Sequence, residues 1–348
     1  MGIGRKVLIT GGLGFIGSHV IEHFVENSLD VIYVLDSETY AANQEFKSEL
    51  LNNEKFKNVK YYKGDIRDET LVNTIFNLNK IDVVIHLAAE SHVDNSIEDP
   101  NVFADVNVLG TMNLLNVARK HWGDNHVTRG KQIYPQKLFY HISTDEVYGA
   151  LEDTVGEFTE ETPYDPRSPY SASKAASDHM VRAYGNTYNI PYIISNCSNN
   201  YGERQHVEKL IPKTIVNILN GIIVPVYGTG SNVRDWLYVK DHAEAIYTIF
   251  QKGMLGETYN IGGDNELMNL TLVRRIIQTM NSSMVEPKLH EMKIIKFVED
   301  RKGHDFRYAV NCKKLQNELG WKPKTNFIDG IRRTIDYYTD YWFKLPTF

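Results

Sequence analysis

Over the first 200 residues, short apolar runs rich in β-branched residues alternate with longer stretches in which apolar positions recur every three or four residues. The apolar runs predict strands at Lys6–Thr10, Val31–Asp36, Val59–Lys63, Ile81–His86, Lys137–Ser143 and Ile190–Cys197. The periodic stretches predict helices at Gly14–Asn27, Asp68–Asn79, Asn101–His121 and Ser168–Tyr188. This alternation favours right-handed βαβ units, so we expect an α/β fold built on a doubly wound parallel sheet.

The pattern changes beyond about residue 200, where glycine and proline separate shorter elements. The run Asp241-His242-Ala243-Glu244 is a capping-box pattern before an apolar stretch and predicts a helix start. Asn311 is a candidate cap for another helix, which we expect to stop at Gly320. We therefore expect one domain over residues 1–200 and a smaller mixed α/β lobe over residues 201–348, with later strands able to return to the first sheet.

The composition of the 348 residues is that of an ordinary globular protein, with 42% hydrophobic and 24% charged residues. The net charge of −6 does not support a broad nucleic-acid surface, and no apolar run is long enough to cross a bilayer. The two cysteines, Cys197 and Cys312, provide neither a disulfide framework nor a zinc cluster. We expect a cytoplasmic protein with no metal and with neither nucleic acid nor membrane as partner.

Three glycines follow the first predicted strand and open the first predicted helix: Gly11, Gly14 and Gly17. Their spacing is a variant of the dinucleotide fingerprint, in which glycine allows a tight turn and the helix N-terminus faces a pyrophosphate. Asp36 ends the second predicted strand, roughly 20 residues further on, where a carboxylate accepts hydrogen bonds from the adenosine ribose and repels a 2′-phosphate. The combination predicts a Rossmann domain that binds NAD rather than NADP. A glycine turn and an exposed strand-end Asp are the alternative.

Two further strand ends bear on the same site. Asp65 follows the third predicted strand and either bonds the adenine amino group or caps the next helix. Leu87-Ala88-Ala89 follows the fourth predicted strand, and its small residues would let a cofactor approach the backbone. The run His19-Val20-Ile21-Glu22-His23 matches a zinc-peptidase pattern, but no third ligand is identifiable, and we interpret its two histidines as surface residues.

A tyrosine and a lysine four residues apart, Tyr170 and Lys174, fall on one face of a predicted helix. The ammonium group, together with the positive ring of oxidised nicotinamide, would lower the pKa of the tyrosine so that it can accept a proton from a secondary alcohol. Lys174 is also a candidate for holding the nicotinamide ribose. A chance pair on a solvated helix face is the alternative to this interpretation.

Thr144, Asp145 and Glu146 follow the fifth predicted strand, at the sheet edge where α/β proteins place their sites. Thr144 is a candidate hydrogen-bond partner for the reacting oxygen beside Tyr170. Elimination of water needs one group that removes a carbon-bound proton and another that protonates a leaving hydroxyl, and two adjacent acids could divide that work. Successive strand residues point to opposite faces, so we expect the strand to have ended by Asp145. Two solvated loop carboxylates are the alternative from this motif alone.

The motifs His86–Asp94, Thr144–Glu146, Pro163–Lys174, Asn196–Tyr201 and Arg234–Val239 occur in an order that resembles the dTDP-glucose 4,6-dehydratases of the extended short-chain dehydrogenase/reductase family. The resemblance covers about residues 5 to 310. It implies a lyase that forms dTDP-4-keto-6-deoxyglucose and water from dTDP-glucose, with bound NAD that is not consumed. Tyr170, Lys174 and Thr144 would serve oxidation at C4, Glu146 would remove the C5 proton, and a protonated Asp145 would release the C6 hydroxyl. The pKa of Asp145 should therefore be raised by burial or by its acidic neighbour.

The resemblance, together with the motifs above, assigns two sets of binding residues. The cofactor set is Gly11, Gly14, Phe15, Ile16, Gly17, Asp36, Ser37, Thr39, Asp65, Ile66, Leu87, Ala88, Ala89, Tyr170, Lys174 and Asn200. The substrate set is Ser91, Thr144, Asn199, Lys209, Leu210, Pro225, Tyr227, Arg234, Asn269, Arg301 and His304. Residues 1–200 would then bind NAD and residues 201–348 the nucleotide sugar. Ala42, Val106 and Lys302 depart from the usual family residues at peripheral positions, and the segment 121–136 carries no motif.

The resemblance also implies a homodimer, paired through the predicted helices Asn101–His121 and Ser168–Tyr188. Three alternatives stay open from the sequence. The first is a 4,6-dehydratase that acts on a UDP-, CDP- or GDP-sugar. The second is a nucleotide-sugar 4-epimerase, which would not need the two acids. The third is a catalytically silent NAD-binding module, although such a module would have no need for both the Tyr–Lys pair and the acids.

Overall fold

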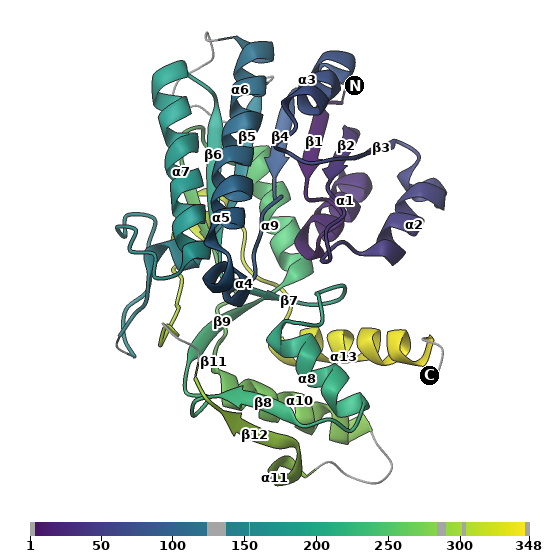
Figure 1. The fold of residues 1–348 in the computed structure, drawn as a ribbon, viewed down its shortest axis with the longest axis vertical. Coiled ribbons are helices and arrows are strands. Elements are labelled where there is room, and N and C mark those ends of the chain that lie inside the picture. The colour runs from purple at the N-terminus through teal and green to yellow at the C-terminus, as the bar shows by residue number, and fades with distance from the viewer. Residues whose placement is uncertain (1–3, 124–136, 153, 284–289, 301–303, 345–348) are drawn as a thin grey trace.

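The computed structural model describes residues 4–123, 137–152, 154–283, 290–300 and 304–344. A seven-stranded parallel sheet forms its larger part, in the order β10-β6-β5-β4-β1-β2-β3 (Figure 1). Its strands are β1 (Lys6–Thr10), β2 (Val31–Asp36), β3 (Val59–Lys63), β4 (Val83–His86), β5 (Leu138–Thr144), β6 (Tyr192–Cys197) and β10 (Thr258–Ile261). The chain reverses direction across the sheet between β1 and β4, which is where open α/β sheets form their binding crevice.

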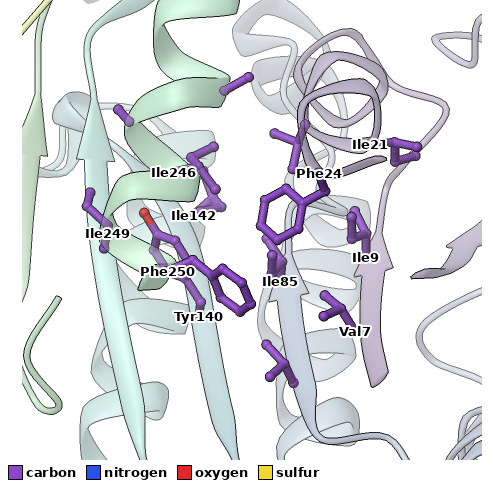
Figure 2. Packing of buried hydrophobic residues seen from close by; sticks show 14 of the residues in the cluster. Val7, Ile9, Ile21, Phe24, Ile85, Tyr140, Ile142, Ile246, Ile249 and Phe250 are labelled. Atoms are coloured by element: carbon purple, nitrogen blue, oxygen red, sulfur yellow. The ribbon is translucent and has the colours of Figure 1, made fainter. Parts of the chain in front are cut away.

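Helices cover both faces of this sheet, as expected for parallel strands. One layer holds α1 (Phe15–Asn27), α2 (Gln44–Asn52), α9 (Val239–Lys252) and α12 (Lys313–Leu319), and the other holds α3 (Glu69–Asn79), α6 (Thr111–Trp122) and α7 (Pro169–Tyr188). Figure 2 shows the first layer, where Phe24 of α1 and Phe250 of α9 meet above the sheet with their ring centroids 4.9 Å apart. Along β1, Val7 and Ile9 belong to this core while Leu8 belongs to the opposite one, so the strand is buried on both faces.

The strands and helices predicted for the first 200 residues are confirmed, and their boundaries agree within two residues. One predicted helix differs in its interior. The predicted helix 101–121 is a continuous helical path made of α5 (Pro100–Phe103), the π-helical segment η2 (Ala104–Gly110) and α6. The wide turn of η2 buries Asn107, whose amide joins the Glu90 backbone to the Ser173 hydroxyl. Short π-helical segments recur at functional sites, and this one ties the end of β4 to the neighbour of Lys174.

The second part of the chain forms a smaller lobe with a core of its own and also completes the first sheet, since β10 pairs with β6. The lobe contains the three-stranded sheet β11-β9-β7 and the two-stranded sheet β12-β8. Its strands are β7 (Asn199–Tyr201), β8 (Val224–Tyr227), β9 (Val233–Tyr238), β11 (Glu266–Met268) and β12 (Ile295–Val298), and its longer helices are α8 (Leu210–Leu219), α10 (Asn269–Ser283) and α13 (Phe327–Lys344). The remaining short helical turns are α4 (Val93–Glu98), α11 (Glu291–Ile294), η1 (Glu54–Phe56) and η3 (Asp145–Tyr148).

The helix signals of this second part are only partly right. The capping box predicted at Asp241 is wrong, because α9 begins at Val239 and the Asp241 carboxylate accepts hydrogen bonds from Lys324 and Thr325 instead. Cys312 takes the position before α12, although the side chain of Asn311 does accept from the Lys313 amide. The predicted stop at Gly320 is confirmed, since this glycine has a positive φ of 74°. Within the described residues, none of the helices combines the length and apolar character needed to span a bilayer.

Candidate active site

Two adjoining cavities open at the carboxyl edge of the parallel strands, at the reversal between β1 and β4. The first has a volume of about 550 Å³ and lies along the ends of β1, β2, β4, β5 and β6. The second, of about 310 Å³, lies between this edge and the smaller lobe. The two share part of their lining: Ser91, Glu146, Asn199, Asn200, Gln205, Glu208 and Lys209. A ligand with two chemically distinct halves would therefore meet both parts of the chain.

The glycine loop shapes one end of the first cavity, and two of its glycines are required by geometry. Gly11 has a φ of 72°, and a Cβ there would lie 2.7 Å from the backbone nitrogen of Ala88. A Cβ on Gly17 would lie 2.2 Å from the carbonyl oxygen of Gly11. No side chain caps the first turn of α1, which begins after Gly14. The loop thus leaves a narrow space beside an uncapped helix N-terminus, which suits a pyrophosphate.

Asp36 lies at the same end, with its side chain fixed by the backbone. One oxygen accepts from the Leu13 amide at 2.9 Å, and the other accepts from the Glu38 amide at 2.8 Å. Burial raises the pKa of this carboxyl, although the two amide hydrogen bonds oppose the shift. The carboxylate lines the cavity where the sequence predicted a ribose contact.

Every residue predicted to contact the dinucleotide lines the first cavity, including the Leu87–Ala89 turn and Asn200. Asp65 is among them, but it caps no helix: its carboxylate pairs with the Arg67 guanidinium, and Asp68 caps α3. Val106, identified as a departure from the family, also lines this cavity.

The zinc-peptidase pattern on α1 requires a correction. His19 is buried rather than at the surface, and its ring nitrogens contact the Glu203 carbonyl and the Arg204 guanidinium. Burial lowers the pKa of His19 to about 3, so the ring is neutral and links α1 to the segment after β7. No cluster of metal-ligating side chains occurs among the residues that the structure describes.

At the other end of the cavity, β5 stops at Thr144 and the chain turns through η3. The prediction that the strand has ended by Asp145 is therefore confirmed. The turn lets Thr144, Asp145 and Glu146 all line the cavity although they are consecutive. The Thr144 hydroxyl lies 3.3 Å from an Asp145 carboxyl oxygen and accepts from the Glu146 amide at 3.3 Å.

Asp145 is the more deeply buried of the two acids, with 2% of its surface exposed. Burial, the adjacent Glu146 and the nearby Asp235 raise its pKa well above the usual value of a carboxyl, as we expected. Its Oδ2 atom has no hydrogen-bond partner among the described residues. A neutral carboxyl with an unused oxygen is equipped to donate a proton to a ligand.

Tyr170 and Lys174 lie on the first turns of α7, whose start is fixed by Pro169 and by a capping box between Ser168 and Ser171. The Lys174 ammonium donates to the Ile142 carbonyl at 2.9 Å, beside the end of β5, and burial lowers its pKa. The pKa of Tyr170 is raised, chiefly by burial and next by the charge of Glu146, although the Thr144 hydroxyl opposes the shift. The protein alone therefore does not supply the lowered pKa that we expected, which leaves that task to a bound positive charge.

The second cavity is lined by the predicted substrate residues Ser91, Asn199, Lys209, Leu210, Pro225, Tyr227, Arg234, Asn269 and His304. Arg234 is 8% exposed, and its guanidinium lies 4.2 Å from the ring centroid of Tyr308 while donating to the Asp305 carbonyl at 2.9 Å. These contacts hold a cation in place at the cavity wall. Arg301 lies outside the described residues.

Several lining residues were not found from the sequence. Gln205 and Glu208 line both cavities, and Tyr308 and Trp236 line the second. Glu208 stands next to the predicted Lys209, so its neighbourhood was a usable signal. Tyr308 belongs to no motif, and only the folded chain, which packs Tyr308 against Arg234, brings it to the site.

Comparison with known proteins identifies the site's relatives. The family described as GDP-mannose 4,6 dehydratase matches residues 8–334. The dTDP-glucose 4,6-dehydratase of Neisseria gonorrhoeae is 46% identical over 343 residues, which cover 97% of this chain and 96% of that protein. The chain belongs to the dTDP-glucose 4,6-dehydratase family.

Solved structures of this family agree with the fold. The dTDP-glucose 4,6-dehydratase DesIV of Streptomyces venezuelae, with NAD and TYD bound, is 39% identical, has a TM-score of 0.86 and covers 97% of each chain. The dTDP-glucose 4,6-dehydratase of Bacillus anthracis in complex with NAD is also 39% identical, with a TM-score of 0.83 and the same coverage. The doubly wound sheet predicted from the sequence is thus the sheet of this dehydratase family.

Proposed function

We propose that this protein is a dTDP-glucose 4,6-dehydratase, which forms dTDP-4-keto-6-deoxyglucose and water with NAD bound throughout. One observation carries the proposal: the buried Asp145, whose pKa is raised, and its neighbour Glu146 line the same cavity as Tyr170 and Thr144. Oxidation alone needs only the tyrosine, its lysine and a hydroxyl. The two acids are the groups that removal of water requires.

NAD fits the first cavity on the evidence of its walls. A side chain on Gly11 or Gly17 would clash with the backbone of Ala88 or of the loop itself, so the glycines keep the loop tight beside the N-terminus of α1, and two backbone amides hold Asp36 in the lining of the cavity. NAD, when bound, supplies the acceptor for the C4 hydride and returns that hydride to C6. Its pyrophosphate would lie at the start of α1, and Lys174 would hold the nicotinamide ribose.

Tyr170 removes the proton of the C4 hydroxyl, and the Thr144 hydroxyl hydrogen-bonds to the same oxygen. The raised pKa of free Tyr170 makes it a poor base until positive charge enters the cavity. The oxidised nicotinamide ring would bring that charge and add it to the charge of Lys174. Proton removal thus becomes favourable only when the cofactor is in place.

Glu146 then removes the C5 proton, which the new C4 ketone makes acidic. Asp145 donates its proton to the departing C6 hydroxyl, so that water leaves. When the hydride returns to C6, a proton returns to C5 and completes the product. Asp145 needs to be neutral for this step, and its burial beside Glu146 keeps it so. The two carboxyl groups therefore act in opposite protonation states.

The nucleotide would occupy the second cavity, where Arg234, Lys209 and Asn199 offer donors for the diphosphate. In this assignment residues 1–200 bind NAD and residues 201–348 bind the nucleotide. Tyr227 and Pro225 lie on β8 at the far wall and would contact the nucleoside.

We also propose a homodimer. Ile97 and Leu109 expose 44% and 54% of their surface along α4 and η2. These apolar side chains would be covered by a second copy of the chain. Light scattering should give a dimer mass, and L109D should give a monomer while the control L78D on α3 should not; a monomeric wild-type protein would disprove this assignment.

The two buried free cysteines, Cys197 and Cys312, fit a reducing cytoplasm.

One assay tests the activity. The purified protein is incubated with dTDP-glucose, and the mass of the product is measured by mass spectrometry, without and with added NAD. We expect loss of one water with no net consumption of NAD. An isomer of unchanged mass would indicate an epimerase, and no turnover would indicate a silent module. A panel of UDP-, CDP- and GDP-sugars tests which nucleotide base the protein prefers. Faster turnover of any of them would identify that nucleotide sugar as the substrate in place of dTDP-glucose.

A further inference from the structure

Glu38 lies two residues beyond Asp36, outside the lining of the first cavity, and holds three side chains at once. Its carboxylate lies 2.7 Å from the Lys47 ammonium, accepts from the Tyr61 hydroxyl at 2.5 Å and accepts from the Lys63 ammonium at 3.3 Å. Only 9% of its side chain is exposed. No motif in the sequence pointed to this residue.

The backbone at Glu38 is shaped to make these contacts. Its φ of 55° lies in the left-handed region that side chains rarely adopt, and its amide donates to the Asp36 carboxylate. The hydrogen bond to Lys47, followed by that from Tyr61, lowers the pKa of Glu38 to about 2. Glu38 is therefore an anion in a fixed position directly behind the carboxylate that faces the ribose.

The two lysines belong to elements that frame the adenosine end of the cavity. Lys63 is the register partner of Asp36 across β2 and β3. Lys47 lies in α2, which starts just after the cavity-lining loop that includes Thr39 and Ala42. Both ammonium groups thus stand near the place where a 2′-phosphate on the adenosine would project, since that phosphate would lie beside Asp36.

We propose that Glu38 is a second determinant of NAD specificity, which acts by cancelling the charges of Lys47 and Lys63. Asp36 repels a 2′-phosphate directly. Two free lysines at the same sheet edge would attract it and would offset that repulsion. With Glu38 bound to both, NADP gains no cationic partner there. The inference rests on the proposed binding of NAD in the first cavity.

The experiment measures the affinity of the full-length, cofactor-stripped protein for NAD and for NADP by calorimetric titration. E38Q preserves the size of the side chain and an oxygen for Tyr61 but releases the charge. We expect its NADP affinity to rise about threefold to tenfold, the scale of partly exposed charge pairs, with NAD affinity unchanged. E38D retains the charge and should keep the wild-type preference. The matched control is E257Q, which loses a similar pair with Lys314 at the opposite edge of the sheet and should change neither affinity.

Two further measurements separate charge from structure. Adding K47M and K63M to E38Q should abolish the gain, and raising the salt concentration should shrink it. If E38Q does not fold, the double variant K47M/K63M of the otherwise unchanged protein leaves Glu38 unopposed and should weaken NADP binding selectively. A wild-type NADP-to-NAD ratio in both E38Q and K47M/K63M would overturn the inference. A wild-type protein that binds neither dinucleotide would instead overturn the proposed function.

Discussion

The carboxylate of Asp178 lies 3.1 Å from the imidazole Nε2 of His141, and both side chains are completely shielded from solvent. Asp178 stands one helical turn after Lys174, and its second oxygen accepts hydrogen bonds from the hydroxyls of Ser143 and Tyr164. The contact with His141, the charge of Lys174 and the hydrogen bond from Ser143 outweigh burial and keep the pKa of Asp178 below its usual value, whereas burial lowers the pKa of His141 to about 4. Behind the catalytic groups, the Asp178 carboxylate is thus a buried anion beside the neutral ring of His141.

D178N tests this buried anion. The amide keeps the shape and one acceptor oxygen but removes the negative charge beside Lys174 and His141, so we expect about 2–4 kcal/mol lower stability in urea unfolding. The control D165N removes an exposed carboxylate in the loop just before α7 and should change stability by less than about 0.5 kcal/mol. Equal effects of the two substitutions would contradict the role given to Asp178.

Y170F removes the base for the C4 hydroxyl and leaves the rest of the cavity intact. We expect turnover to fall by about 10²–10⁴-fold while NAD stays bound to the purified protein. Turnover is followed by product mass and cofactor content by release after denaturation. The control Y184F alters an exposed tyrosine of the same helix, which bonds Asn116, and should leave both measurements unchanged. Normal turnover in Y170F would remove Tyr170 from the mechanism.

E146Q removes the base for the C5 proton but not the machinery for oxidation. In deuterated water we expect dTDP-glucose to be oxidised at C4 with no solvent deuterium incorporated at C5. Nuclear magnetic resonance of the recovered sugar measures this exchange. Wild-type exchange in the variant would assign the base to another group.

D145N removes the acid that releases the C6 hydroxyl. We expect oxidation to proceed and dehydration to slow, so reduced nicotinamide should accumulate and be visible by its near-ultraviolet absorbance after mixing with substrate. In the wild-type protein, the dehydration step should slow as the pH rises through the raised pKa of Asp145, because the acid is then ionised. Absence of accumulated reduced cofactor would contradict this role.

The same substitution should stabilise the fold. The pKa of Asp145 is higher in the folded state than in the unfolded chain, so the folded protein binds more protons and loses stability as the pH rises above about 4. The amide that replaces the carboxyl in D145N does not titrate. We therefore expect D145N to gain stability over wild type as the pH rises from about 4 to 8, with the two proteins closest in stability near pH 4. Urea unfolding at several pH values measures the difference, and a constant difference at all pH values would contradict the assignment.

The sequence predicted the sheet well because most of its strands are buried on both faces and the crossing helices have a regular apolar stripe. Val31–Asp36 and Val59–Lys63 match their strands residue for residue. The glycines and Asp36 were identifiable because their roles depend on short-range backbone geometry. The hydrogen bonds of Asp241 could not be predicted, because the amides that bind its carboxylate belong to Lys324 and Thr325, more than 80 residues away.

The electrostatic part of the site was harder to predict. The raised pKa of Asp145 followed from its acidic neighbour and from expected burial. The lowered pKa of Tyr170 was expected with oxidised nicotinamide in place; in the protein without it, burial and the charge of Glu146 raise the pKa of the hydroxyl. Glu38 escaped notice since its three partners come from α2 and β3, and only the folded chain brings them together.

The return of β10 to the large sheet has a consequence for biosynthesis. As the chain leaves the ribosome, β6 is complete at Cys197, but its edge stays unpaired until Thr258–Ile261 has been translated. Of the smaller lobe, β7, α8, β8 and β9 are synthesised in that interval. An exposed strand edge is a template for wrong pairing, so this stretch of translation is the period in which a nascent chain most needs protection by a chaperone.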